Sequence, residues 1–210
     1  MDNRRLKIKV CGMKDPENLE QLCELSPEYV GFIFYPDSKR FVGRSPDPAL
    51  FQIPGPEIMK VGVFVDQEIS QVKRAVDTFG LDMVQLHGGE TVDYCRDLAG
   101  EGTQVIKAMD PRKRPDALES YSSAVDLLLF DSAGEGRGGT GLKFDWDLLR
   151  HMTIQVPYLL SGGIGPGDAE ILRGTSFTGM AGIDINSRFE LSPGIKDIQI
   201  LRKFINELRK

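Results

Sequence analysis

Eight short apolar runs recur along the 210-residue chain, and most of them end at a glycine, a proline or a polar residue. Their nearly continuous apolar character predicts strands that are buried on both faces, as in parallel sheets. The runs occupy residues 8–11, 29–34, 60–65, 83–86, 104–108, 127–130, 158–161 and 182–185.

The segments between these runs carry helical patterns. Asp15, Pro16 and Glu17 form a strong helix start, with an N-cap acid and a proline in the first turn. Apolar residues repeat at helical spacing over 69–79 and again over 198–208. Strands that alternate with helices favour βαβ units. Eight such units predict an α/β fold, a single (β/α)8 TIM barrel formed by one domain over residues 1–210. The helical signal is weakest near 48–52 and 115–121.

The charge balance restricts the partners of the chain. It carries 26 Lys and Arg residues against 31 Asp and Glu residues, a net charge of −5. Phosphate-backbone binding requires an excess of basic residues, so we expect no nucleic-acid partner. Backbone amides can still hold one phosphate, and a small phosphorylated molecule therefore remains a candidate substrate. No stretch approaches the roughly 20 apolar residues of a membrane helix, so we expect no membrane partner either.

The cysteines and histidines do not indicate a metal site. Cys11, Cys23 and Cys95 are widely spaced, and only His87 and His151 could add imidazole ligands. We therefore expect no metal and no organic cofactor. Disulfides are not expected, and the opening MDNRRLKIKVCGMKD has no apolar signal core, which together favour the cytoplasm. We also expect a monomer.

An active site is expected where the strands of such a barrel end. Cys11 closes the first run and Asp131 follows the sixth. The two can face one another across the barrel mouth, one taking a proton while the other gives one, as moving a double bond requires. Cys11 is alternatively a small buried hydrophobe, and Asp131 alternatively caps backbone amides.

Further candidates follow other strands. Gly162 and Gly163, after the seventh run, and the loop after Asp184 fit a phosphate site, because glycines let backbone N–H groups approach phosphate oxygens. Arg40 is suited to bidentate carboxylate binding, although it could equally lie on the surface. His87 is expected to pack or to hydrogen-bond beside the site. The loop 134–141 is either a lid or a long connection.

Taken in order, the motifs resemble the phosphoribosylanthranilate isomerase family of tryptophan biosynthesis over nearly the whole chain. They are KVCGMKDPENL, GFIFYPDSKRFV, KVGVFVD, VQLHGGE, IKAMDP, LLLFDSAGEGRGGTGLKFDW, LLSGGIGPGDAE and SPGIKD. The resemblance implies an Amadori rearrangement of N-(5-phosphoribosyl)anthranilate to 1-(2-carboxyphenylamino)-1-deoxyribulose 5-phosphate, without a cofactor.

The resemblance also implies residue roles. Cys11 is then the general base, Asp131 the general acid and Arg40 the ligand of the anthranilate carboxylate. Phosphate binding is implied for Gly162, Gly163, Asn186 and Ser187, with His87 and Asp184 at the substrate site. The chain departs from the family at three positions. Asn186 stands where a serine is usual, Arg188 where a glycine is usual, and Leu142 where a lysine often follows GGTG.

Three alternatives remain open. One is an aminoaldose isomerase of histidine biosynthesis, which would be expected to use two aspartates where this chain has Cys11 at the first strand. The second is a pentose-phosphate epimerase, which would require a metal-binding set of histidines. The third is a non-catalytic barrel that binds a phosphorylated ligand without turnover.

Overall fold

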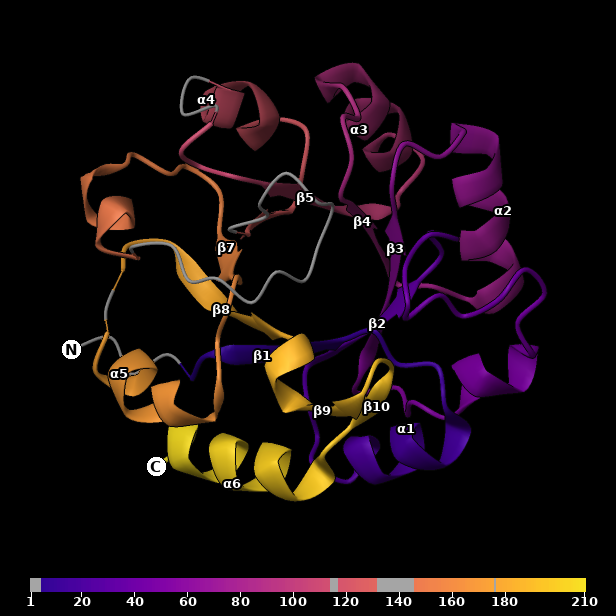
Figure 1. Cartoon of the computed structure of the whole chain (residues 1–210). Helices are drawn as coiled ribbons and strands as arrows, with labels where there is room; N and C mark the ends of the chain where they lie inside the picture. The colour runs from indigo at the N-terminus through magenta and orange to yellow at the C-terminus, as the bar shows by residue number, and fades with distance from the viewer. Residues whose placement is uncertain (1–4, 114–116, 132–145, 176) are drawn as a thin grey trace.

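A closed barrel of eight parallel strands forms the centre of the computed structural model, which describes residues 5–113, 117–131, 146–175 and 177–210 (Figure 1). Each strand pairs with its neighbours in chain order, and β8 closes the ring on β1. The TIM-barrel prediction is thereby confirmed, and the eight expected strands differ from the observed ones only at their ends. They are β1 Lys7–Cys11, β2 Tyr29–Ile33, β3 Met59–Phe64, β4 Met83–Leu86, β5 Gln104–Met109, β6 Leu127–Phe130, β7 Tyr158–Leu160 and β8 Met180–Ile185.

Helices surround the barrel (Figure 1). The α-helices are α1 Pro16–Cys23, α2 Ile69–Phe79, α3 Val92–Ala99, α4 Ala117–Ser122, α5 Ala169–Gly174 and α6 Ile198–Leu208. Shorter 3₁₀ helices are Pro48–Gln52, Trp146–His151, Pro166–Asp168 and Ser187–Phe189. The weak helical signal near residue 50 therefore corresponds to a single 3₁₀ segment between β2 and β3. Among the described residues, no helix is long and apolar enough to cross a membrane.

The helix start expected at Asp15 is present. The Asp15 side chain accepts a hydrogen bond from the Asn18 backbone N–H at 2.9 Å, and Pro16 occupies the first turn. Asp197 caps α6 in the same way, accepting from the N–H groups of Gln199 and Ile200. These caps satisfy backbone donors that the first turn of a helix otherwise leaves without partners.

The core has two layers, one inside the barrel and one between the strands and the helices. Inside, Tyr29, Val61, Leu129 and Leu159 are among a cluster of buried apolar side chains. Outside, a larger cluster joins the outward faces of the strands to the helices. Because side chains alternate along a strand, each strand contributes to both layers.

A two-stranded antiparallel hairpin between β8 and α6 was not expected from the sequence. It consists of β9 Glu190–Ser192 and β10 Ile195–Lys196, and its turn contains Gly194 with a φ of 90°. Such short strands have too few residues to show an alternating pattern. The hairpin matters because it supplies Glu190 and Lys196 to the carboxyl end of the barrel.

Phe51 is the centre of an aromatic cluster that joins the β2–β3 connection to α2. Its ring centroid lies 4.4 Å from that of Phe79 and 4.7 Å from that of Phe32, and Phe51 is fully buried. Truncation to alanine, Phe51→Ala, is expected to lower the free energy of unfolding by about 3–5 kcal/mol, because it leaves a cavity. Urea denaturation measures this loss. The control Leu191→Ala, at an exposed position, should change stability by less than about 0.5 kcal/mol.

Candidate active site

The thiol of Cys11 lies at the carboxyl end of β1, where it is 4% exposed. Its register partner on β2 is Gly31, and a Cβ atom there would come within 2.8 Å of the Cys11 Sγ. A side chain at position 31 would therefore displace the thiol. Gly12, which follows with a φ of 82°, leaves room in the same way for Arg40.

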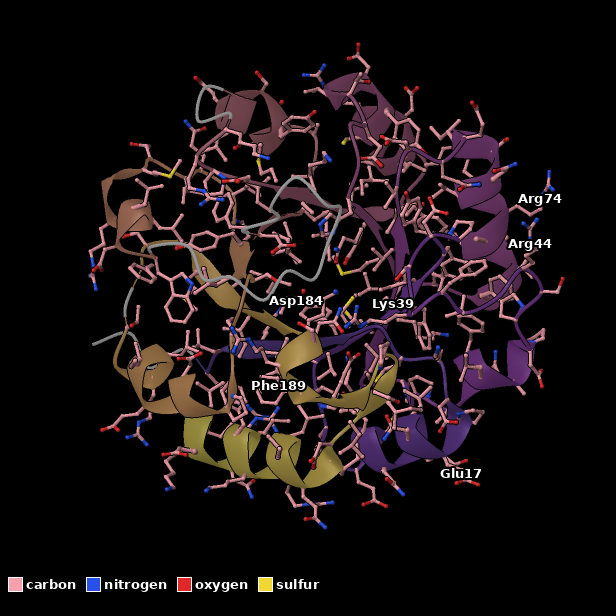
Figure 2. All side chains as sticks on the ribbon, in the orientation of Figure 1. Glu17, Lys39, Arg44, Arg74, Asp184 and Phe189 are labelled. Carbon is pink, nitrogen blue, oxygen red and sulfur yellow. The ribbon has the colours of Figure 1, made fainter. Side chains whose placement is uncertain are left out.

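Beneath the thiol lies a buried ion pair. Lys9 Nζ donates to Asp184 Oδ1 at 2.8 Å, and Ser161 Oγ donates to Asp184 Oδ2 at 3.1 Å. Asp184 is labelled in Figure 2, near the middle of the ring of strands. Asp184 was predicted to lie at the substrate site, and both of its carboxylate oxygens accept hydrogen bonds from protein groups. Lys9 was not predicted as a site residue, because a single lysine within an apolar run is usually expected to face solvent.

Asp131 and His87 lie together after β6 and β4. The His87 Nε2 atom is 3.4 Å from Asp131 Oδ2, and both side chains are largely buried. On its other side, His87 Nδ1 lies 2.9 Å from the Gln85 amide nitrogen. These two contacts hold the imidazole ring between Gln85 and Asp131.

A second buried ion pair holds the backbone around His87. Lys107 Nζ donates to the Leu86 carbonyl at 3.2 Å and to the Gly88 carbonyl at 2.8 Å, one on each side of His87. It also pairs with Glu90 Oε2 at 2.9 Å, and Glu90 in turn accepts from the Gly88 N–H. This pair fixes the loop that carries His87, and it was not predicted from the sequence.

Arg40 meets a carboxylate, and that carboxylate belongs to the protein. Its Nε donates to Glu190 Oε1 at 2.8 Å and its Nη2 to Glu190 Oε2 at 2.6 Å. Lys196 Nζ, which is fully buried, also donates to Glu190 Oε1 at 2.8 Å and to Asn186 Oδ1 at 2.7 Å. A continuous chain of contacts thus runs from Arg40 through the hairpin to the loop after β8.

The charges around Glu190 determine its ionisation. Burial opposes the charged form, but the Arg40 hydrogen bonds and the nearby Lys196 ammonium outweigh it and lower the pKa of Glu190 to about 2. Glu190 is therefore an anion at every pH at which the protein is expected to work. Burial lowers the pKa of Lys196, although Glu190 opposes that shift.

The loops after β7 and β8 adjoin one another. Gly162 and Gly163 have φ values of 82° and 74°, a left-handed conformation that favours glycine. A Cβ atom at Gly165 would lie 3.9 Å from Arg188, which places the two loops in contact range. Asn186 precedes the 3₁₀ helix that begins at Ser187. The loop 134–141 and Leu142 lie outside the described residues.

The expected site residues therefore share one end of the barrel. Cys11 and Asp131 end strands that are separated around the ring by β8 and β7. Within the described part of the chain, no group of three His, Cys, Asp or Glu side chains is arranged to hold a metal ion. The arrangement offers a thiol, a carboxyl group, the Lys196 cation on the hairpin, the Arg40 cation in the loop after β2 and a glycine-bearing loop, which suits proton transfer on an anionic molecule.

Comparison with known proteins identifies the family. A family model described as "N-(5'phosphoribosyl)anthranilate (PRA) isomerase" matches residues 8–207. The N-(5'-phosphoribosyl)anthranilate isomerase of Parabacteroides distasonis is 42% identical over 206 residues, covering 96% of this chain and 92% of the relative. The enzyme of the same name from Phocaeicola vulgatus is 38% identical, covering 97% and 98% of the two chains.

Solved structures agree with this result. Phosphoribosyl anthranilate isomerase from Thermus thermophilus superposes with a TM-score of 0.84 at 26% identity, covering 97% of this chain and 98% of the other. An isomerase of the same name, solved in complex with reduced 1-(o-carboxyphenylamino)-1-deoxyribulose 5-phosphate, gives a TM-score of 0.80 at 28% identity with the same coverage. The Thermotoga maritima enzyme gives 0.82 at 30% identity, again with that coverage.

The barrel and the polar residues at its carboxyl end define a (β/α)8-barrel enzyme that acts as an isomerase. The family match extends over nearly all of the chain. The chain belongs to the N-(5'-phosphoribosyl)anthranilate isomerase family.

The acid dependence of stability provides a test of the Glu190 contacts. The folded-state pKa of about 2 lies below the ordinary value of 4.5, so the stabilisation is complete above pH 4.5 and is lost as pH falls toward 2. Glu190→Gln is expected to cost about 3 kcal/mol at pH 7, and less at pH 3, measured by urea unfolding. The exposed Glu101→Gln should cost less than about 1 kcal/mol at either pH. A Glu190→Gln cost that does not depend on pH would contradict the assignment.

Proposed function

We propose that this chain catalyses the Amadori rearrangement of N-(5-phosphoribosyl)anthranilate to 1-(2-carboxyphenylamino)-1-deoxyribulose 5-phosphate, a step of tryptophan biosynthesis, with Cys11 as general base and Asp131 as general acid. The observation that carries the proposal is the position of both side chains at one end of the barrel, on β1 and directly after β6. The related enzyme with the reduced 5-phosphate bound supports the choice of substrate.

The first step opens the ribose ring. Asp131, in its protonated form, gives its proton to the ring oxygen, and the C1–O bond breaks to leave a Schiff base between C1 and the anthranilate nitrogen. The His87 imidazole, 3.4 Å from Asp131 Oδ2, orients the carboxyl group toward the sugar. The Lys107–Glu90 pair fixes the backbone on both sides of His87 and so limits the movement of that imidazole.

The second step moves the double bond. The thiolate of Cys11 takes the proton from C2, and the C2–H electrons form the enolamine, which then tautomerises to the ketone. Only the thiolate can act as the base. Burial raises the pKa of the Cys11 thiol, so the free enzyme holds it mainly protonated at neutral pH. A dry, enclosed thiolate is in turn more reactive than a solvated one.

The two ends of the substrate are anionic, and the site has groups for each. Glu190 engages Nε and Nη2 of Arg40, and the Nη1 donors of Arg40 are proposed to bind the substrate carboxylate. Gly162, Gly163, Asn186 and Ser187 are proposed to bind the phosphate through backbone N–H groups. The polar contact from Lys196 to Asn186 adds a cation beside that loop.

The remaining expectations concern the setting of the enzyme. We expect a small phosphorylated substrate as its partner, a cytoplasmic location and a monomeric state. A relative from Thermotoga maritima is described as dimeric, so size-exclusion chromatography with light scattering is needed to determine the state of this chain.

The test of the proposal follows the fluorescence of the anthranilate substrate as it is consumed. Cys11→Ala and Asp131→Asn are each expected to lower kcat at least about 100-fold, because each removes a group that transfers a proton. Cys23→Ala removes the thiol on α1 and should leave kcat within about twofold. Circular dichroism confirms that each variant is folded.

The outcome separates the alternatives. A wild-type chain that binds inorganic phosphate but does not consume the substrate is a ligand-binding barrel. A chain that instead turns over an aminoaldose of histidine biosynthesis is an aminoaldose isomerase, and one that turns over a pentose phosphate is an epimerase. Near-normal kcat in either variant removes that residue from the mechanism.

A further inference from the structure

We infer that the buried ammonium group of Lys9, held by Asp184, is the cation that stabilises the thiolate of Cys11. The inference rests on the proposed function in so far as that thiolate is the general base. Lys9 is therefore a positioning residue for the reaction. It acts through Cys11 and does not transfer a proton itself.

The alternation of β1 brings the two groups together. Residues 9 and 11 are two apart on one strand, so both side chains point into the barrel. A single point, the Cβ position that Gly31 lacks, lies 2.8 Å from Cys11 Sγ and 3.2 Å from Lys9 Nζ. The thiol and the ammonium group therefore border the same small space above Gly31. No water-filled surface intervenes, because Lys9 is fully buried and Cys11 nearly so.

Asp184 keeps the ammonium charged. Burial disfavours a charged lysine, but Asp184 and Cys11 together outweigh burial and raise the pKa of Lys9 above its ordinary value. Ser161 fixes the other carboxylate oxygen at 3.1 Å. Lys9 and Asp184 are also register partners on the paired strands β1 and β8. The cation is thus held in place and remains charged throughout the working pH range.

Other charged groups also face the thiol, and their effects differ in sign. Burial makes the largest contribution to the raised pKa of Cys11, and Lys9 is the strongest opposing influence. Asp184 raises the pKa of the thiol, while Lys196 on β10 lowers it. Arg40, from the loop after β2, is also near enough to interact with Cys11. Lys196 and Arg40 are both bound to Glu190 on the hairpin, whereas Lys9 Nζ and the thiol border the same space above Gly31.

The alternative is that Lys9 and Asp184 merely fill the barrel as a structural pair. The two explanations differ in the pH dependence of the thiol. A structural pair affects stability but leaves the thiolate fraction of Cys11 unchanged at a given pH. An electrostatic partner within a few ångströms shifts that titration by about 1 to 3 pH units.

The decisive experiment is alkylation by iodoacetamide as a function of pH, read for each cysteine by peptide mass spectrometry. Lys9→Met removes the charge and retains most of the volume. It is expected to move the Cys11 alkylation midpoint upward by at least about 1 pH unit. Cys23, in the same molecule, should keep its midpoint. The control Lys7→Met removes an equal charge from the amino end of β1 and should leave the alkylation midpoint of Cys11 unchanged.

A double variant covers the case in which Lys9→Met does not fold, since it would leave Asp184 without its cation. Lys9→Met with Asp184→Asn removes both charges and replaces the pair by neutral side chains, which buried sites often accept. Its Cys11 midpoint should lie above that of wild type and no higher than that of Lys9→Met. A midpoint within about 0.3 pH units of wild type, which corresponds to roughly a twofold change in the thiolate fraction, overturns the inference in either variant.

The pH profile of kcat/KM separates this inference from the proposed function. If both are correct, the ascending limb moves upward in Lys9→Met together with the alkylation midpoint, and kcat/KM at pH 7 falls about tenfold or more. If the midpoint moves but the limb does not, Lys9 still stabilises the thiolate and Cys11 is not the base. If neither moves, the Lys9 assignment fails, and the role of Cys11 is then decided by Cys11→Ala.

Discussion

Only two inward positions are available near the carboxyl end of β1, and Lys9 and Cys11 occupy them. Side chains alternate along β1, and β1 is paired with β2 on one side and with β8 on the other. Whatever chemistry the thiol performs takes place directly above a lysine that has no route to solvent. The surrounding residues make this arrangement possible. Asp184 compensates the charge of Lys9, and Gly31 leaves space for both Lys9 and Cys11.

Two further buried ion pairs lie at the same end of the barrel. Lys107 and Glu90 hold the loop after β4 from behind the sheet, while Lys196 and Glu190 join the hairpin to Arg40. A buried charge is costly without a partner, and each partner here fixes backbone or a side chain at the candidate active site. In this chain the charged groups under the site serve to position it.

The barrel itself could be predicted because its signals are local. Runs such as YVGFIF predict buried strands, and the N-cap at Asp15 marks a helix start that the structure confirms. The end of the barrel that carries Cys11 and Asp131 follows from the same pattern, since both close apolar runs. The hairpin could not be predicted, because β10 has only two residues and no periodicity.

The partners of the site residues depend on contacts between distant parts of the chain. Arg40 and Glu190 are 150 positions apart, and Lys9 and Asp184 are 175 apart. The local sequence IKVC does not indicate which residue of another strand will pair with Lys9 in the closed barrel. The sequence indicated Arg40 as a carboxylate ligand, but only the coordinates show that one carboxylate is already bound there.

The contact between Arg40 and Glu190 has a consequence for anion binding at this end of the barrel. Arg40 and Lys196 together carry two positive charges, and Glu190 cancels one of them. Glu190 already engages Nε and Nη2 of that guanidinium. An anion that replaced Glu190 at Arg40 would leave the buried Lys196 ammonium without its carboxylate partner, so displacement of Glu190 carries the cost of an uncompensated buried charge.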